Sequence, residues 1–146
     1  MFEPHYYNVE VSWTRDRKGT LCSPEVKEGQ LPKNGCINVA TPPEFPKGIA
    51  GIWSPEHFFT AAVGSCLMTT FLSIAENSKL EFVSFYCMSR GKLEQIDGAF
   101  LMTEVILEPR VVIRSESQKE RAQKVLQKAE QNCLISNSLK SRIEMR

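Results

Sequence analysis

The stretch from Ser54 to Glu76 constrains the fold of this chain more than any other. It has no charged residue between Phe58 and Ala75, and its apolar side chains do not fall on one narrow helical stripe. A helix that is apolar on all sides is normally buried. Ser54 suits the N-cap and Pro55 the first helical position, where a missing backbone N–H costs nothing. The sequence therefore predicts a buried central helix beginning at Pro55.

The same stretch reaches the length of a membrane-spanning helix, so that alternative has to be weighed. Hydroxyl side chains dilute its apolar character, Gly64 weakens it, and no cluster of Lys or Arg flanks either end as a topology signal requires. Burial inside a soluble fold is the favoured interpretation, and no membrane partner is expected.

One domain over residues 1–146 is expected, because a chain of this length can build a core without metal or disulfide staples. Acidic and basic residues are mixed throughout and the net charge is +1. The sequence therefore has no excess of positive charge that would favour nucleic acid as a partner. The N-terminus has neither the basic nor the apolar region of a secretory signal. We therefore expect a cytoplasmic protein.

The cysteines lie at scattered positions, and their number is odd. Without a secretion signal, this argues against a structural disulfide framework. There is no C-x-x-C pair, and the two histidines lie in unrelated contexts, so a metal site is not expected. Because most buried cysteines are inert, Cys22, Cys36 and Cys87, which lie in strand-like contexts without any special partner, are interpreted as structural.

The N-terminal part of the chain has the pattern of short strands. Alternating apolar and polar residues predict a half-buried strand from Tyr7 to Trp13. A charged turn, Arg15–Gly19, leads to a short strand, Thr20–Cys22, and a polar excursion over residues 23–32 separates it from a third strand, Gly35–Val39. A loop rich in Pro and Gly then leads into the central helix.

The part after the central helix begins with two long β segments, Leu80–Ile96 and Phe100–Ile113. Asp97-Gly98 between them is a strong two-residue hairpin signal. Pro109 suggests an edge position or a bulge in the second arm.

A second helix is predicted from about residue 118, because Ser117 and Glu120 have the spacing of a capping box. Cys133 falls on its buried face, and Ser141–Arg146 is expected to add a last strand. The order of elements predicts an α+β fold, with both helices packed on antiparallel sheets.

Cys66 differs from the other cysteines because it lies in the middle of the central helix. It receives no help from a helix N-terminus, and burial alone would raise the pKa of its thiol. A reactive thiolate at this position would therefore need a cation delivered from elsewhere.

Two groups of residues carry a resemblance to a known family. The first is Pro55-Glu56-His57-Phe58-Phe59 with Ala61-Ala62 and Gly64-Ser65-Cys66, and the second is Ala129-Glu130-Gln131-Asn132-Cys133 with Ser136-Asn137. In this pattern the chain resembles the OsmC/Ohr family, named for osmotically inducible protein C and organic hydroperoxide resistance protein. The resemblance covers nearly the whole chain in element order. It implies an intertwined homodimer with antiparallel sheets around the central helix.

The resemblance also implies an activity, that of a thiol-dependent peroxidase that reduces organic hydroperoxides to alcohols. Cys66 matches the peroxidatic cysteine, which would form a sulfenic acid, and Cys133 matches the resolving cysteine, which would close a disulfide. Glu56 matches the active-site glutamate. The active-site arginine is matched by Arg17, with Arg15 as the fallback if the turn shifts the register. An external dithiol, in one branch a lipoyl group, would reopen the disulfide.

Glu56 and Cys66 are ten positions apart, and ten residues of helix rise about 15 Å, beyond the reach of a glutamate side chain. If both serve one site, Glu56 comes from a second subunit. The alternative is that Glu56 is only a first-turn acid that favours the helix dipole.

Other questions stay open at this point. Several apolar residues either line a substrate pocket or belong to the core: Ile52, Trp53, Phe58, Phe59 and Met68. The approach Gly51-Ile52-Trp53-Ser54-Pro55 departs from the Gly-Thr-Asn-Pro form of the better-known branches, which affects the expected substrate and reductant. The competing hypothesis is a non-enzymatic dimeric module that binds a small ligand or senses redox state.

Overall fold

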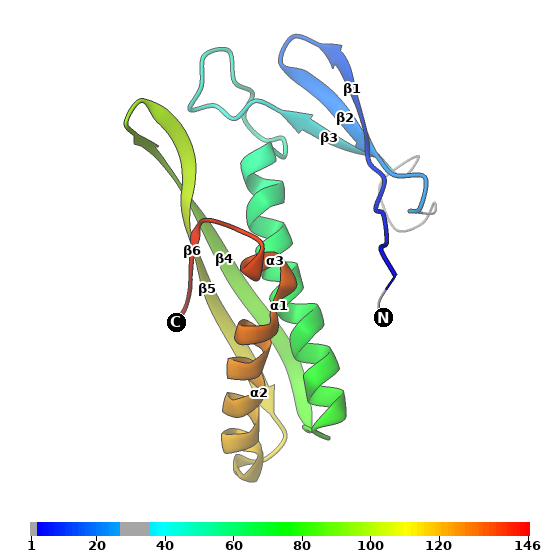
Figure 1. Ribbon diagram of the computed structural model, residues 1–146, viewed down its shortest axis with the longest axis vertical. Coiled ribbons are helices and arrows are strands. Elements are labelled where there is room, and N and C mark those ends of the chain that lie inside the picture. Colours follow the sequence, from blue (N-terminus) through cyan, green and yellow to red (C-terminus); the bar gives the residue numbers. More distant parts are fainter. Residues whose placement is uncertain (1–2, 27–35) are drawn as a thin grey trace. The chain divides into compact units, whose positions relative to one another are not determined.

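The computed structural model describes residues 3–26 and 36–146 in two compact units, Met1–Pro55 and Glu56–Arg146 (Figure 1). Each unit has a sheet of its own, with strand order β1-β2-β3 in the first and β4-β5-β6 in the second. The helices follow the first sheet, so the architecture is α+β, as predicted.

In the first unit, β1 (Glu10–Arg15), β2 (Lys18–Cys22) and β3 (Cys36–Ala40) form an antiparallel sheet. The loop after β3 contacts the turn between β1 and β2 through one hydrogen bond, in which the N–H of Thr41 donates to the carbonyl of Arg17 at 3.1 Å. The predicted strands are confirmed to within a few residues. Most of the predicted polar excursion over residues 23–32 lies outside the described residues.

The first strand was expected to be half-buried, and this was wrong. It begins at Glu10 rather than Tyr7, and every residue of it is exposed, with Val11 at 69% and Trp13 at 75%. The alternation that predicts a strand also predicts an apolar face. The described residues of the first unit do not cover that face.

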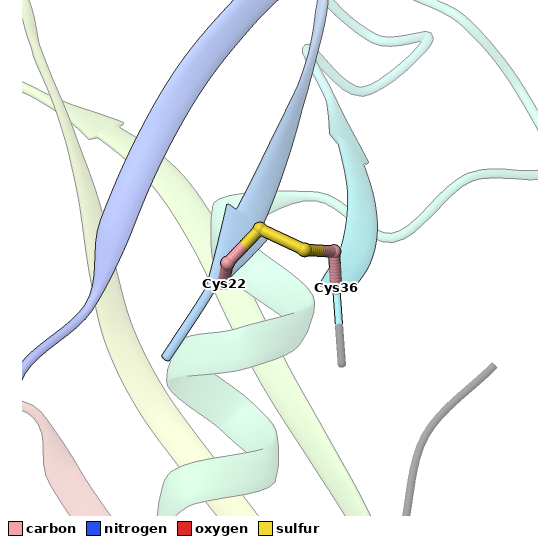
Figure 2. Close-up of a disulfide and its surroundings, with 2 residues drawn as sticks. All are labelled: Cys22 and Cys36. Atoms are coloured by element: carbon pink, nitrogen blue, oxygen red, sulfur yellow. A yellow bond between two sulfur atoms is a disulfide. The ribbon is translucent and has the colours of Figure 1, made fainter. Parts of the chain in front are cut away.

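The prediction that Cys22 and Cys36 have no special partner was also wrong, because they form a disulfide (Figure 2). Cys22 ends β2 and Cys36 begins β3, and the antiparallel register places them directly opposite each other. Their Cα atoms are 4.4 Å apart, within the range that a disulfide spans. A cysteine at the end of one predicted strand and another at the start of the next was the signal that could have found this pair.

The second unit starts with α1 (Pro55–Asn77), which begins at the predicted proline, followed by β4 (Phe82–Ile96) and β5 (Ala99–Ile113). These strands form the predicted hairpin, and both turn residues have positive φ, 48° at Asp97 and 81° at Gly98, as the favoured two-residue turn requires. The last strand, β6 (Arg142–Met145), pairs with β5 in parallel. The second sheet is therefore mixed rather than purely antiparallel.

Three short segments separate β5 from β6: a 3₁₀ turn (Glu116–Gln118), α2 (Lys119–Asn132) and α3 (Leu134–Asn137). The predicted capping box does not form. Ser117 lies inside the 3₁₀ turn with its hydroxyl 2.7 Å from that of Ser115, while Glu120 pairs with Lys124 at 2.8 Å. Because the extra turn moves the start of α2 to Lys119, Ser117 is too early to cap it.

The core of the second unit joins α1, α2 and β5. Its fully buried members come from all three elements: Val63, Leu67, Phe71, Ala75, Val105, Leu107, Val125 and Ala129. The Phe71 ring packs against Phe82 and Phe85, with centroid distances of 5.3 and 4.8 Å. Gly64 lets α1 approach β4, because a Cβ there would collide with the Ser89 hydroxyl. The core thus fixes α1 from its middle to its end.

The opposite side of α1 is uncovered in this chain, since Met68 and Leu72 are exposed. By length and composition alone α1 could cross a membrane, and 28% of its apolar stretch is buried within the chain. The core helix of a soluble protein can have the same length and composition, so these two properties are weak grounds for a membrane span. The prediction of a buried central helix therefore holds for one side of α1 only.

Candidate thiol site

Cys66 and Cys133, far apart in the sequence, meet in the second unit. Cys66 lies in the middle of α1 and is 8% exposed, while Cys133 lies between α2 and α3 and is 1% exposed. The Cys133 side chain donates a hydrogen bond to Cys66. Because both belong to one unit, the chain itself brings the two sulfur atoms together.

The turn after α2 positions Cys133. At this residue the backbone leaves the helical conformation, with φ −68° and ψ 105°. The chain then forms the short helix α3, where the N–H of Asn137 donates to the Cys133 carbonyl at 3.0 Å. The Ser136 hydroxyl donates to Cys133 Sγ at 3.2 Å. Both the backbone and the sulfur of Cys133 are thereby held in place.

The surroundings of Cys66 favour its thiolate. Burial raises the pKa of the thiol, but hydrogen bonds from the Cys133 side chain, the Ile135 backbone, the Thr70 hydroxyl and the Leu134 backbone outweigh it. The pKa of Cys66 therefore lies below its ordinary value. The Thr70 Oγ1 atom is 3.9 Å from Cys66 Sγ. Hydrogen bonds to the charged form of a group lower its pKa in this way.

This differs from the expectation that a thiolate in mid-helix needs a cation from elsewhere. The donors come from the same unit. Thr70 follows Cys66 by four positions, which is helical neighbour spacing, so the sequence contained a signal for it. The contribution of α3 depends on how the turn folds and could not be seen in the sequence.

Cys133 is shifted in the opposite direction. Burial raises the pKa of its thiol, as do the hydrogen bond to Cys66 and the charge of Cys66, and the hydrogen bonds from Ser136 only partly offset them. Cys66 is therefore the more acidic of the two thiols. The surroundings therefore favour ionisation at Cys66 rather than at Cys133.

Glu56 lies in the first turn of α1, ten positions before Cys66 on the same unbroken helix. Its Oε2 atom is buried and has no hydrogen-bond partner among the described residues. Leaving a buried carboxylate oxygen unsatisfied is costly. Glu56 therefore has room for a donor that this chain, as described, does not supply.

Arg17 and Arg15 both belong to the first unit, whereas Cys66 and Glu56 belong to the second. Arg17 is exposed and lies in the turn between β1 and β2, where its carbonyl accepts from Thr41. It lines a cavity of about 420 Å³ together with Asp16, Lys47 and Ile49. Arg15 is the last residue of β1 and pairs in register with Lys18.

Cys87 is half-buried on β4, where burial raises the pKa of its thiol and its Sγ lies 3.7 Å from the Ser89 hydroxyl. This fits its interpretation as a structural residue. Of the residues that were expected either to line a pocket or to join the core, Phe59 packs against the core, while Met68 and Trp53 are exposed.

Comparison with known proteins shows the family of this chain. Residues 48–146 match the family model described as OsmC-like protein. The chain is 22% identical over 144 residues to uncharacterized protein YmaD of Bacillus subtilis, covering 97% of this chain and 91% of YmaD.

Solved structures agree. An OsmC-like protein of unknown function from Vibrio cholerae, VCA0330, superposes with a TM-score of 0.82 at 24% identity, covering 98% of this chain and 99% of that one. An organic hydroperoxide resistance protein from Elizabethkingia anophelis gives 0.73 at 23% identity, with coverages of 99% and 95%.

The fold and the site thus define an α+β protein with a thiol pair formed by a cysteine of its central helix and a cysteine of the turn after α2. The protein belongs to the OsmC-like family, as the resemblance in its sequence predicted.

Proposed function

We propose that this protein is a thiol-dependent peroxidase that reduces organic hydroperoxides to alcohols. The observation that carries the proposal is the pairing of Cys66 with Cys133, one with a lowered and the other with a raised pKa. A thiolate is the form of cysteine that attacks peroxides. Family members named organic hydroperoxide resistance proteins share the fold and support the same substrate class.

The proposed reaction has three steps. The Cys66 thiolate attacks the O–O bond of the hydroperoxide, which gives a sulfenic acid and, after protonation, an alcohol. Cys133 condenses with the sulfenic acid, so that a disulfide forms and water leaves. An external dithiol, for which a lipoyl group is the proposed source, then reduces the disulfide by exchange.

Arg17 and Glu56 complete the proposed site. The Arg17 guanidinium polarises the bound peroxide, and Glu56 orients the guanidinium through a bidentate pair. The buried, unsatisfied Oε2 of Glu56 supports this assignment, since a guanidinium would provide the missing donor. We further propose that residues 1–146 act as one OsmC-like domain and that the protein works in the cytoplasm.

The activity is tested by mixing reduced protein with cumene hydroperoxide and a dithiol. Consumption of the peroxide is expected, with one alcohol formed per disulfide reduced. Without the dithiol, one equivalent of peroxide is expected to remove two hydrogen atoms from each chain by intact mass, and Cys133→Ser is expected to abolish this loss. No peroxide consumption above the rate of dithiol alone would contradict the proposal and favour a non-enzymatic binding or redox-sensing module.

We propose that the working form is an intertwined homodimer in which Glu56 serves the site of the partner subunit. Two uncovered apolar surfaces support a dimer, the face of β1 with Val11 and Trp13 and the side of α1 with Met68 and Leu72. Large exposed apolar surfaces mark interaction sites. The helical separation of Glu56 from Cys66 supports exchange of Glu56 between subunits.

The dimer is tested in two ways. Sizing at micromolar concentration is expected to give twice the mass of the chain, and a monomer would contradict the proposal. The second test mixes Glu56→Gln with Cys66→Ser after subunit exchange. A mixed dimer then has one complete site, formed by Cys66 of one chain and Glu56 of the other, so activity above either parent is expected. Activity no higher than the average of the parents would place Glu56 in the site of its own chain.

A further inference from the structure

Ser136 has an unusual hydrogen-bond partner. Its hydroxyl donates to the sulfur of Cys133 at 3.2 Å, and Cys133 is almost fully buried. Ser138, on the same turn, instead donates to the backbone carbonyl of Leu134 at 2.8 Å, the ordinary use of a serine at a helix end. The Ser136 hydroxyl thus binds the sulfur of Cys133, which has to lose its proton in the proposed resolving step.

The hydrogen bonds around the thiol pair form a chain with a direction. Ser136 donates to Cys133, and the thiol of Cys133 donates to Cys66. A donor at Cys133 Sγ binds the thiolate of that residue more strongly than its neutral thiol, because charge strengthens the bond. Cys66 has the opposite effect on Cys133. Its negative charge and the hydrogen bond that it accepts from Cys133 both raise the pKa of Cys133 and keep this residue protonated.

We propose that Ser136 is a positioning residue for the resolving step. We further propose that oxidation of Cys66 removes the negative charge that keeps Cys133 protonated, so that Cys133 can ionise. This inference rests on the peroxidase function proposed above. Before reaction, the Cys66 thiolate holds the proton of Cys133 between the two sulfur atoms. Once Cys66 is a neutral sulfenic acid, that charge is gone, while the Ser136 hydroxyl still favours the thiolate of Cys133.

The step balances in atoms and electrons. Cys133 loses its proton and attacks the sulfur of the Cys66 sulfenic acid, the S–S bond forms as the S–O bond breaks, and the hydroxide leaves with that proton as water. Cys133 is oxidised as the sulfenic sulfur of Cys66 is reduced. The resolving cysteine is therefore activated only after the peroxide has been consumed, and until then its thiol stays protonated and donates its hydrogen bond to the Cys66 thiolate.

The experiment measures the rate of disulfide closure by intact mass after one equivalent of cumene hydroperoxide, across a range of pH. Ser136→Ala is expected to close the disulfide about tenfold more slowly at neutral pH, the size of effect that one hydrogen bond to a charged group gives. More Cys66 sulfinic acid is expected as a result, because the sulfenic acid persists longer. The difference from the unmodified protein should shrink at high pH, where Cys133 ionises without help.

Two matched variants separate this role from a structural one. Ser136→Thr keeps the hydroxyl and is expected to restore the rate, while Ser138→Ala removes a hydroxyl from the same turn and is expected to change nothing. A Ser136→Ala variant that closes the disulfide at the unmodified rate would overturn the proposal. Slowing by an equal factor at every pH would also overturn it, because that pattern reports a displaced Cys133.

Diamide distinguishes failure of this inference from failure of the proposed function. It forms an adduct on the Cys66 sulfur, and Cys133 then displaces the hydrazine to give the same disulfide without any hydroperoxide. If hydroperoxide is not turned over but the Ser136 effect persists with diamide, the peroxidase function fails and this inference stands. If turnover is normal and Ser136→Ala has no effect with either oxidant, the inference fails alone.

Discussion

Replacing Cys66 with serine is expected to abolish hydroperoxide reduction, with turnover lowered by at least about a thousandfold, as is usual when a catalytic nucleophile is removed. A serine hydroxyl is not ionised at neutral pH and forms no sulfenic acid. The hydrogen bonds that lower the pKa of Cys66 therefore cannot produce a nucleophile in this variant. The measurement is consumption of cumene hydroperoxide with a dithiol in excess.

Cys87→Ser is the matched control, because Cys87 is a free thiol of the same unit with a raised pKa. It is expected to retain the turnover of the unmodified protein. Undiminished turnover in Cys66→Ser would mean that another group reduces the peroxide, and the proposed chemistry would then be wrong.

Replacing Arg17 with glutamine is expected to lower kcat/KM for cumene hydroperoxide about a hundredfold, the effect of removing one donor that stabilises charge in a transition state. The rate at which iodoacetamide alkylates Cys66 is expected to change little. The reason is that the pKa of Cys66 is already lowered by hydrogen bonds from its own unit. The two measurements together separate polarisation of the peroxide from formation of the thiolate.

Arg15→Gln is the control for this variant, since Arg15 is an exposed cation two positions away in the chain. It is expected to leave kcat/KM unchanged. If Arg15→Gln is the variant that loses activity, the active-site arginine is assigned two residues too late. If Arg17→Gln slows alkylation of Cys66 as strongly as turnover, the cation and not the α3 turn holds the thiolate.

Much of the fold could be predicted because the signals are local. The start of α1 at Pro55 follows from a proline that fits the first helical turn, and the hairpin follows from Asp97-Gly98, whose positive φ values the turn requires. The family pattern around Cys66 and Cys133 predicted that these residues belong together, and the structure brings them together.

What was missed depends on contacts between distant residues or on competition between local ones. The pairing of Cys22 with Cys36 depends on the register of two strands, and the parallel pairing of β6 depends on where α3 returns the chain. The capping box failed because a 3₁₀ turn took up Ser117. The burial expected for β1 is absent in one chain because alternation predicts an apolar face but not what covers it.

The disulfide between β2 and β3 has a consequence for every assay that counts thiols. Of the chain's five cysteines, only Cys66, Cys87 and Cys133 are free thiols in the native protein. Closure of the Cys66–Cys133 bond would leave Cys87 as the single group that a thiol reagent can still titrate. Because the chain already holds the Cys22–Cys36 disulfide, thiol counts before and after turnover have to be compared with a starting value of three free thiols rather than five.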